Sequence, residues 1–199
     1  MSKVETITID TPSGSNTMQI GSTNTATINL GVSGDTINVP AGVTIANAGT
    51  ATGFGGANTP QFYAELSANQ SVSSGSWTKI NFNTEKIDTD GKYDNSSNYR
   101  FTPTVAGNYY VFGQVAFDEL AADKVAYAAI YFNGSHANGN SGTYTSSILT
   151  TATPKVGIML TFDTDDYVEF YAYHNHGSSR NAIGNSTTES YFGAYKLIT

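Results

Sequence analysis

Two histidines stand at alternate positions in the stretch Tyr173-His174-Asn175-His176, a candidate for metal chemistry. Side chains two residues apart on a strand point to the same side, and neutral imidazole is a common ligand of transition metals. Around a threefold axis, six such rings could hold one metal ion. The Gly177 and Ser178 that follow are typical of an ordinary loop, and this interpretation is favoured. His174 and His176 are therefore only weak metal candidates.

A second candidate is the acidic stretch from Asp88 to Asp94, where carboxylates alternate around Gly91. Oxygen ligands around a glycine are typical of calcium loops, but this stretch is shorter than the twelve-residue loop and has no bidentate Glu at its end. A solvated hairpin is the favoured interpretation. Asp88 and Asp90 are accordingly weak metal candidates, and we expect no cofactor.

Catalysis has little support in the sequence. Asp163, Asp165, Asp166 and Glu169 could supply a carboxylate pair for glycoside hydrolysis, but their place at a turn between strands argues against it. The sequence contains no nucleophile elbow, zinc signature or phosphate loop. We expect a protein that is not an enzyme.

Binding is the remaining function, because turn-rich loops combine aromatic faces with amide and imidazole groups that suit a sugar or a surface polymer. The alternative is that these aromatic residues belong to the core or to contacts between subunits. The candidate receptor-binding residues are Tyr93, His136, Asn138, Tyr144, His174, His176 and Arg180.

Composition narrows the class of protein further. Of the 199 residues, 39% are hydrophobic and 12% aromatic but only 13% charged, which indicates a packed β protein rather than a disordered chain. A formal charge of −7 disfavours nucleic acid and anionic membranes as partners. Since there is no cysteine, no apolar run long enough to span a membrane and no signal-like start, we expect neither disulfides, nor membrane insertion, nor secretion.

Before residue 60, short apolar pairs alternate with polar turns, as at Ile28 and Leu30, Ile37 and Val39, and Val43 and Ile45. One copy of such a strip cannot bury enough surface to offset its ordering entropy. We therefore predict an extended, triple-stranded β shaft over residues 11–59, with residues 1–10 as an attachment peptide that adds a strand to a neighbouring protein. A low-complexity leader without fixed structure is the alternative.

The sequence of residues 60–199 predicts an antiparallel β-sandwich of the jelly-roll type. Longer strand-like segments with more apolar residues follow one another there between Gly, Asn, Asp and Ser turns. The stretch Asp118 to Lys124 is too short for a helix, and we interpret it as a turn between strands. The expected strands cover residues 61–67, 77–83, 99–104, 108–117, 124–133, 143–150, 154–162, 167–174 and 189–198.

These residues carry a family resemblance. The pattern Phe101-x-Pro103-x-x-x-Gly107-x-Tyr109-Tyr110-x-Phe112 resembles the signature of the globular head of complement C1q, a branch of the tumour-necrosis-factor-like jelly rolls. Further segments resemble the family in order, although Asp165 stands where the family has Gly. They are Trp77-x-Lys79-Ile80-x-Phe82, Tyr93-Asp94-Asn95, Ile130-Tyr131-Phe132-Asn133-Gly134, Asp165 to Phe170 and Tyr191-Phe192-Gly193-Ala194-Tyr195.

The resemblance covers roughly residues 62–198 and implies a homotrimer whose subunits pack through flat aromatic faces. A threefold head and a shaft that needs three strands can share one axis. The shaft-like stretch over residues 36–55 looks like bacteriophage fibre and appendage proteins. We therefore expect a trimeric virion protein, assembled in the host cytoplasm and released by lysis, whose knob binds a host cell-surface glycan or protein. The alternative is a purely structural decoration or trimerisation module.

Overall fold

The computed structural model describes residue 20 and residues 27–46, 58–184 and 189–198, with the side chains of residues 138–140 left out. It divides the chain into two compact units, Met1–Ala51 and Thr52–Thr199, here called the leader and the head. The described part of the head contains strands and turns and no helix. All strand pairs are antiparallel, so the expected antiparallel all-β class is confirmed.

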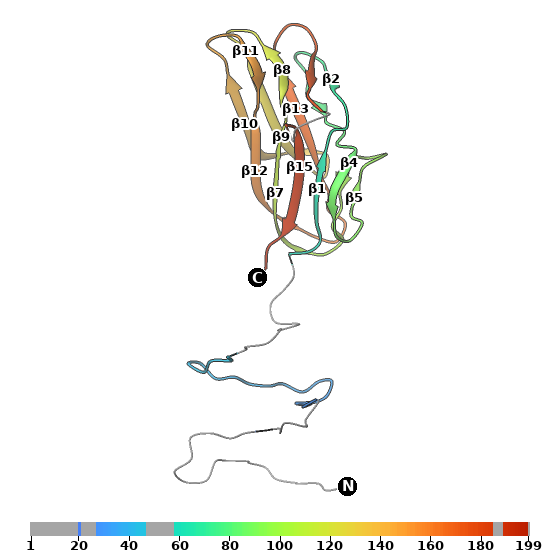
Figure 1. Cartoon of the computed structure of the whole chain (residues 1–199), viewed down its shortest axis with the longest axis vertical. Coiled ribbons are helices and arrows are strands. Elements are labelled where there is room, and N and C mark those ends of the chain that lie inside the picture. Colours follow the sequence, from blue (N-terminus) through green and yellow to red (C-terminus); the bar gives the residue numbers. More distant parts are fainter. Residues whose placement is uncertain (1–19, 21–26, 47–57, 185–188, 199) are drawn as a thin grey trace. The chain divides into compact units, whose positions relative to one another are not determined.

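The strands form three hydrogen-bonded sheets (Figure 1). The five-stranded sheet has the order β12 (Lys155–Phe162), β7 (Gly107–Gln114), β15 (Tyr191–Lys196), β1 (Gln61–Glu65) and β4 (Thr84–Asp88). The six-stranded sheet contains β10 (Ser135–Tyr144), β9 (Val125–Phe132), β13 (Val168–His174), β6 (Arg100–Phe101), β5 (Tyr93–Asp94) and β3 (Thr78–Lys79). The four-stranded sheet has the order β11 (Leu149–Ala152), β8 (Phe117–Leu120), β14 (Arg180–Ala182) and β2 (Gln70–Val72).

The four-stranded sheet continues the layer of the five-stranded sheet. Its order β11-β8-β14-β2 repeats the order β12-β7-β15-β1 strand for strand, because each of these strands is the chain neighbour of its counterpart. At the break, the Val115 amide donates to the Pro154 carbonyl at 3.2 Å and the Ile183 amide donates to the Ala116 carbonyl at 2.7 Å. The head is therefore a two-layer sandwich with one bent layer, consistent with a jelly roll.

Aromatic rings fill the space between the layers. Phe62 of β1 stacks on Tyr93 at 4.5 Å and on Phe101 at 4.6 Å, and it meets the edge of Phe192 at 4.9 Å. Along β7 every second residue is buried, and β13 follows the same alternation except that Glu169 is buried too, as a strand with one face on a core predicts. Since the interior is built from large rings, removal of one of them leaves a cavity that its neighbours cannot fill.

The corner between β6 and β7 moves the chain from one layer to the other. Pro103 follows the short strand β6, and Gly107 opens β7 with a φ of 146°, a conformation that disfavours side chains. The hydroxyl of the buried Tyr109 donates to the Val105 carbonyl at 2.8 Å and holds this corner. The expected role of Gly107 and the change of sheet are confirmed.

The expected turn at Asn133-Gly134 is also confirmed. Both residues have positive φ, 50° and 74°, as a two-residue hairpin turn of type I′ requires. The turn joins β9 to β10 with Phe132 opposite Ser135.

The interpretation of Asp118 to Lys124 as a turn is wrong for its first half. β8 continues to Leu120, whose side chain is fully buried and whose backbone pairs with Leu149 of β11. The turn comes at Ala122 and Asp123. The prediction of one strand over residues 143–150 is wrong as well, because β10 ends at Tyr144 and β11 begins at Leu149.

The described part of the leader has two reverse turns and no strand of its own. The turns close with the Asp35 amide on the Val32 carbonyl at 3.0 Å and the Val43 amide on the Pro40 carbonyl at 3.2 Å. Gly34 and Gly42 supply the positive φ, 98° and 84°, that the third position of a type II turn needs. The large apolar side chains in the described part of the leader are all exposed, from 40% at Val39 to 79% at Val32.

The substitution Phe192→Ala tests the aromatic core. We expect it to lower the free energy of unfolding of the head by about 3–5 kcal/mol, because a fully buried ring is lost and its neighbours cannot close the cavity. Denaturant titration of the full chain, followed by near-ultraviolet circular dichroism, measures this change. Ile87→Ala, at a side chain 48% exposed on β4, is the matched control and should change the stability by less than about 0.5 kcal/mol.

Candidate functional site

One aromatic cluster covers the outward face of the five-stranded sheet. Tyr110 and Phe112 of β7 lie 5.7 Å apart, and both rings lie within 6.3 Å of Tyr195 on β15. Tyr191 stacks on Tyr63 of β1 at 5.6 Å. These five residues, here called the tyrosine face, are each partly exposed and point away from the core.

Two glycines make room for the tyrosine face. A side chain at Gly157 would overlap the hydroxyl of Tyr110, and a Cβ at Gly193 would lie 2.7 Å from the ring of Phe112. The rings can therefore lie low across β12 and β15, and beside them a shallow depression of about 400 Å³ opens. Its lining residues are Tyr110, Phe112, Gly113, Lys155, Val156, Gly157, Tyr191 and Tyr195.

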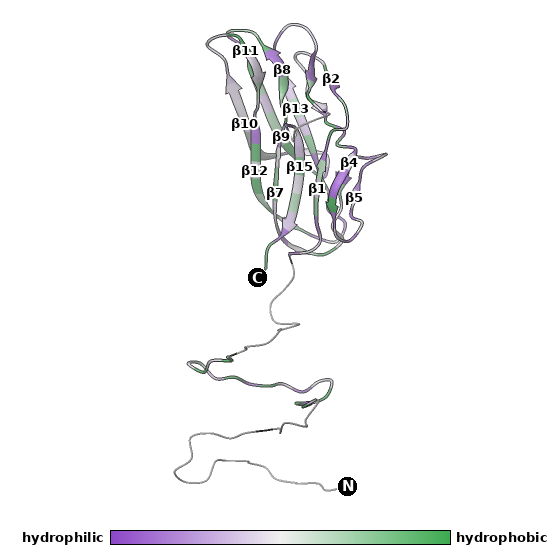
Figure 2. Ribbon diagram, viewed as in Figure 1, coloured by the Kyte–Doolittle hydropathy of each residue, from purple (hydrophilic) through white to green (hydrophobic). Residues whose placement is uncertain are grey.

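The edge strand next to this depression adds apolar surface. Figure 2 shows much of β12 in green, and the side chain of Met159 on this strand is 70% exposed. Exposed rings and aliphatic side chains gathered on one sheet face are typical of a contact surface for another protein.

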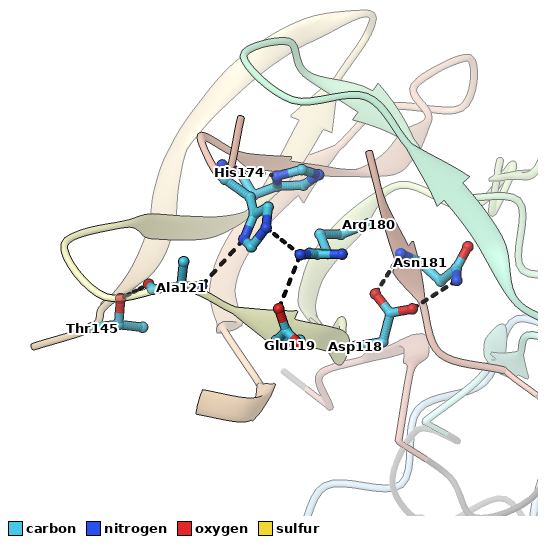
Figure 3. A network of polar contacts seen from close by, with 8 residues as sticks. Asp118, Glu119, Ala121, Thr145, His174, Arg180 and Asn181 are labelled. Carbon is cyan, nitrogen blue, oxygen red and sulfur yellow. Dashed lines mark hydrogen bonds and ion pairs between the residues drawn. The ribbon is translucent and has the colours of Figure 1, made fainter. Parts of the chain in front are cut away.

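A polar network lies in the four-stranded sheet (Figure 3). Arg180 of β14 pairs with Glu119 of β8 at 3.1 Å and contacts Nε2 of His176. The Ala121 amide donates to Nδ1 of His176 at 3.1 Å. Because hydrogen-bond donors face both ring nitrogens, the imidazolium form is disfavoured. Burial and the Arg180 guanidinium lower the pKa of His176.

A second pair in the same network joins β8 to β14 more directly. Asp118 accepts from the backbone amide and from the side-chain amide of Asn181, both at 2.7 Å. Thr145 donates to the Ala121 carbonyl at 2.5 Å and thereby holds the turn after β8. These contacts fix strand and turn geometry, and they occupy the polar groups that a ligand would need.

His174 belongs to the interior. Its side chain is fully buried, its Nε2 lies 3.0 Å from the Val72 carbonyl and its Nδ1 accepts from the His176 amide at 3.3 Å. These partners require the neutral tautomer with the proton on Nε2. Burial is the main cause that lowers the pKa of His174. The weak metal candidates His174 and His176 are both in contact with other groups, His174 with the Val72 carbonyl and the His176 amide, and His176 with the Ala121 amide and Arg180.

The acidic metal candidates hold turns. Asp88 accepts from the amides of Lys92 and Tyr93, each at 3.0 Å, and Asp90 accepts from the Thr89 hydroxyl at 3.1 Å. Asp166 accepts from the Asp163 amide at 2.6 Å in the turn after β12. Among the described residues, no group of three or more His, Cys, Asp or Glu side chains is arranged to hold a metal ion.

The structure does not bring the sequence-predicted binding residues together. Tyr93 is a core residue, 5% exposed, and its hydroxyl donates to the Phe82 carbonyl at 2.8 Å. Tyr144 is 64% exposed and donates to Asp123 at 2.9 Å. His176 joins His174 and Arg180, because its amide donates to the His174 ring and its own ring contacts Arg180. His136 lies elsewhere on β10, and the side chain of Asn138 is outside the described residues.

A second aromatic cluster, which the sequence analysis missed, covers the outward face of the six-stranded sheet. Its centre is Trp77, whose ring lies 5.5 Å from Tyr173 of β13 and 5.7 Å from His136. Tyr127 and Tyr131 of β9 each lie 6.3 Å from Trp77. The cluster is here called the tryptophan face and consists of Trp77, Tyr127, Tyr131, His136, Tyr171 and Tyr173.

A signal for the tryptophan face was present in the sequence. Tyrosines stand at positions 167, 171 and 173 and again at 127 and 131, an odd-numbered alternation that places them on one side of each strand. The sequence could not show that the two strands are neighbours, with Tyr173 opposite Tyr127.

Comparison with known proteins supports the fold. No family model matches the chain, and no curated protein matches it. Among solved structures, the globular domain of the zebrafish complement 1qA protein is 14% identical with a TM-score of 0.52, covering 70% of this chain and 98% of that one. The Eiger TNF of S. frugiperda is 12% identical with a TM-score of 0.50, over 69% of this chain and 90% of that one.

Murine APRIL is similar to the same extent, at 10% identity and a TM-score of 0.50 over 69% of this chain and 98% of the other. At such low identity the similarity shows the fold alone. The expected resemblance of the head to the jelly rolls of complement C1q and tumour necrosis factor is confirmed at that level.

The described residues contain no helix that is long and apolar enough to cross a membrane.

The lowered pKa of His174 predicts an acid-sensitive head. A folded-state pKa below the ordinary value of 6.5 means that the unfolded chain binds the proton more readily, so stability is full above pH 6.5 and falls as the pH decreases toward the folded-state value. Unfolding titrations at several pH values between 7.5 and 5 should show this loss, and His174→Gln should reduce it. His136→Gln removes an exposed histidine and is the control. An unchanged slope in His174→Gln would contradict the assignment.

Proposed function

We propose that the chain is a homotrimeric fibre or appendage protein of a bacteriophage virion, whose head binds a receptor on the host cell surface. The observation that carries this proposal is the leader. Every large apolar side chain in its described part is at least 40% exposed in the single chain, although these residues recur as pairs two residues apart beside hydrogen-bonded turns.

Other copies of the same chain are the simplest partners that could bury the exposed apolar side chains of the leader. Extended segments with type II turns leave backbone donors and acceptors unpaired, and neighbouring copies can satisfy these groups while burying Ile37, Val39 and Val43. The strip is too narrow to enclose an interior alone. Three copies about one axis close it, which is the architecture of a β shaft.

The tyrosine face supports self-association of the head as well. Five partly exposed rings, the depression beside them and the apolar edge strand β12 form a continuous surface that is suited to bury against another subunit. A closed cyclic assembly can use such a surface once per subunit. Because leader and head belong to one chain, both must follow the same symmetry.

Receptor binding rather than catalysis is the function proposed for the head. Among the candidate catalytic side chains, Asp166 holds a turn and Glu169 pairs with Lys79, while His176 accepts from the Ala121 amide. Three identical heads would multiply weak contacts on a dense surface polymer. Residues 1–10, which lie outside the described residues, are proposed to dock on a neighbouring virion protein.

The oligomeric state is the first test. We expect the full chain at micromolar concentration to sediment with three times the mass of one 21.1 kDa chain. Tyr195→Asp should dissociate it, because a charge would be buried in the tyrosine face. The control Tyr144→Asp changes an exposed tyrosine on β10 and should leave the mass unchanged. An ordered monomer for the parent chain would refute the proposal.

Cell binding is the second test. Fluorescently labelled trimer should bind host cells saturably, and enzymatic removal of surface polysaccharide should abolish the binding. The absence of saturable binding to cells that the virion infects would instead favour a purely structural role in the virion.

A further inference from the structure

The tryptophan face is a second aromatic layer that lies outside the core. Ala129 on β9 is fully buried, yet it does not belong to the cluster of side chains between the sheets. It stands midway between Tyr127 and Tyr131 on the outward side, where these rings and their neighbours shield it from water. The aromatic residues of the tryptophan face therefore cover this part of the sheet.

Contacts within the layer keep its rings in place. Tyr131 stacks on Tyr171 of the neighbouring strand at 3.9 Å, and Tyr127 lies 6.0 Å from Tyr173. The ring of Tyr127 extends over Gly142 of β10, where any side chain would overlap it. Trp77 closes the arrangement by packing against rings from β9, β10 and β13. A surface held in this way loses little side-chain entropy when a ligand binds.

Polar groups border the rings. Lys79 pairs with Glu169 at 2.5 Å beside Tyr171 and also donates to the Asn98 carbonyl at 3.0 Å. Arg100 lies 4.3 Å from the ring centre of Tyr167. Burial raises the pKa of Tyr131 and Tyr171, so their hydroxyls stay protonated and can donate as well as accept hydrogen bonds.

The two aromatic faces differ in chemistry. The tyrosine face includes Phe112 and borders the exposed Met159, whereas every ring of the tryptophan face carries an N–H or O–H group. Rings with polar edges match pyranose sugars, whose C–H faces stack on aromatic rings while their hydroxyls need donors and acceptors at the border. The net charge of −7 and the carboxylate of Glu169 favour a neutral sugar over an anionic one.

We propose that the tryptophan face is a binding site for a neutral hexopyranose chain, which stacks on Trp77, Tyr131 and Tyr173 and hydrogen-bonds to the polar groups at their border. This inference deepens the proposed function and depends on it for its biological role. The tryptophan face lies on the six-stranded sheet and the tyrosine face on the five-stranded sheet, so the two faces are separate surfaces of the head.

Trp77 is the single tryptophan of the chain, so its fluorescence reports on this site alone. The test titrates the full-length protein with soluble hexasaccharides of β-linked glucose, galactose and N-acetylglucosamine. At least one of them should change the Trp77 emission saturably and protect it from acrylamide quenching. Tyr173→Ala should weaken that binding about tenfold, the effect of one lost stacking contact. Ile148→Ala, at an exposed side chain between β10 and β11, should bind as the parent does.

The outcomes separate this inference from the proposed function. Trimers whose Trp77 emission responds to none of the sugars, or responds equally in Tyr173→Ala and in the parent, would overturn the sugar site while the fibre proposal survives. A monomeric chain that shows the expected response, with loss of affinity in Tyr173→Ala, would support the sugar site and refute the fibre. Sedimentation of each variant establishes which case applies.

Discussion

A single interior is the constraint on which this structure depends. The head has one space that excludes water, between its two layers, and stacked rings such as Phe62, Tyr93 and Phe192 fill it. Apolar groups outside that space must meet other molecules or remain in water. The tyrosine face, the tryptophan face and the exposed apolar residues of the leader are all outside it. On these three surfaces, apolar groups of the head and the leader are exposed and available for contact with other molecules.

The polar residues follow the same constraint. His174 lies within the sandwich as a neutral ring with both nitrogens in contact with backbone groups. Its hydrogen bond to the Val72 carbonyl holds β13 next to β2. Asp118, Arg180 and Glu119 do the same for β8 and β14 at the surface. Several groups that looked reactive in the sequence are structural in the fold, and we propose that recognition depends on aromatic residues of the strands.

The sequence predicted those parts of the fold that local geometry dictates. Gly107 needs a positive φ, Asn133-Gly134 suits a tight hairpin, and alternating apolar residues mark β7, β9 and β13, so corner, turn and strands could be placed from residue types. The short strands β2 and β14 carry too few residues for a period, and β8 contains Asp118 and Glu119, which disfavour strands. Only their pairing partners stabilise them.

The candidate site was harder to predict because it depends on which strands are neighbours. Tyr93 has the residue type of a binding residue, but the proximity of Phe62 and Phe82 makes it a core residue. Trp77, Tyr127 and Tyr173 lie far apart in sequence and meet only because β3, β9 and β13 pair side by side. Hydrogen exchange of the leader amides in the full-length protein at micromolar concentration tests the central claim most directly. We expect the backbone amides of residues 28–45 to exchange slowly and to lose this protection when the trimer is dissociated. Fast exchange of these amides in an intact trimer would contradict the burial of the leader between copies of the chain.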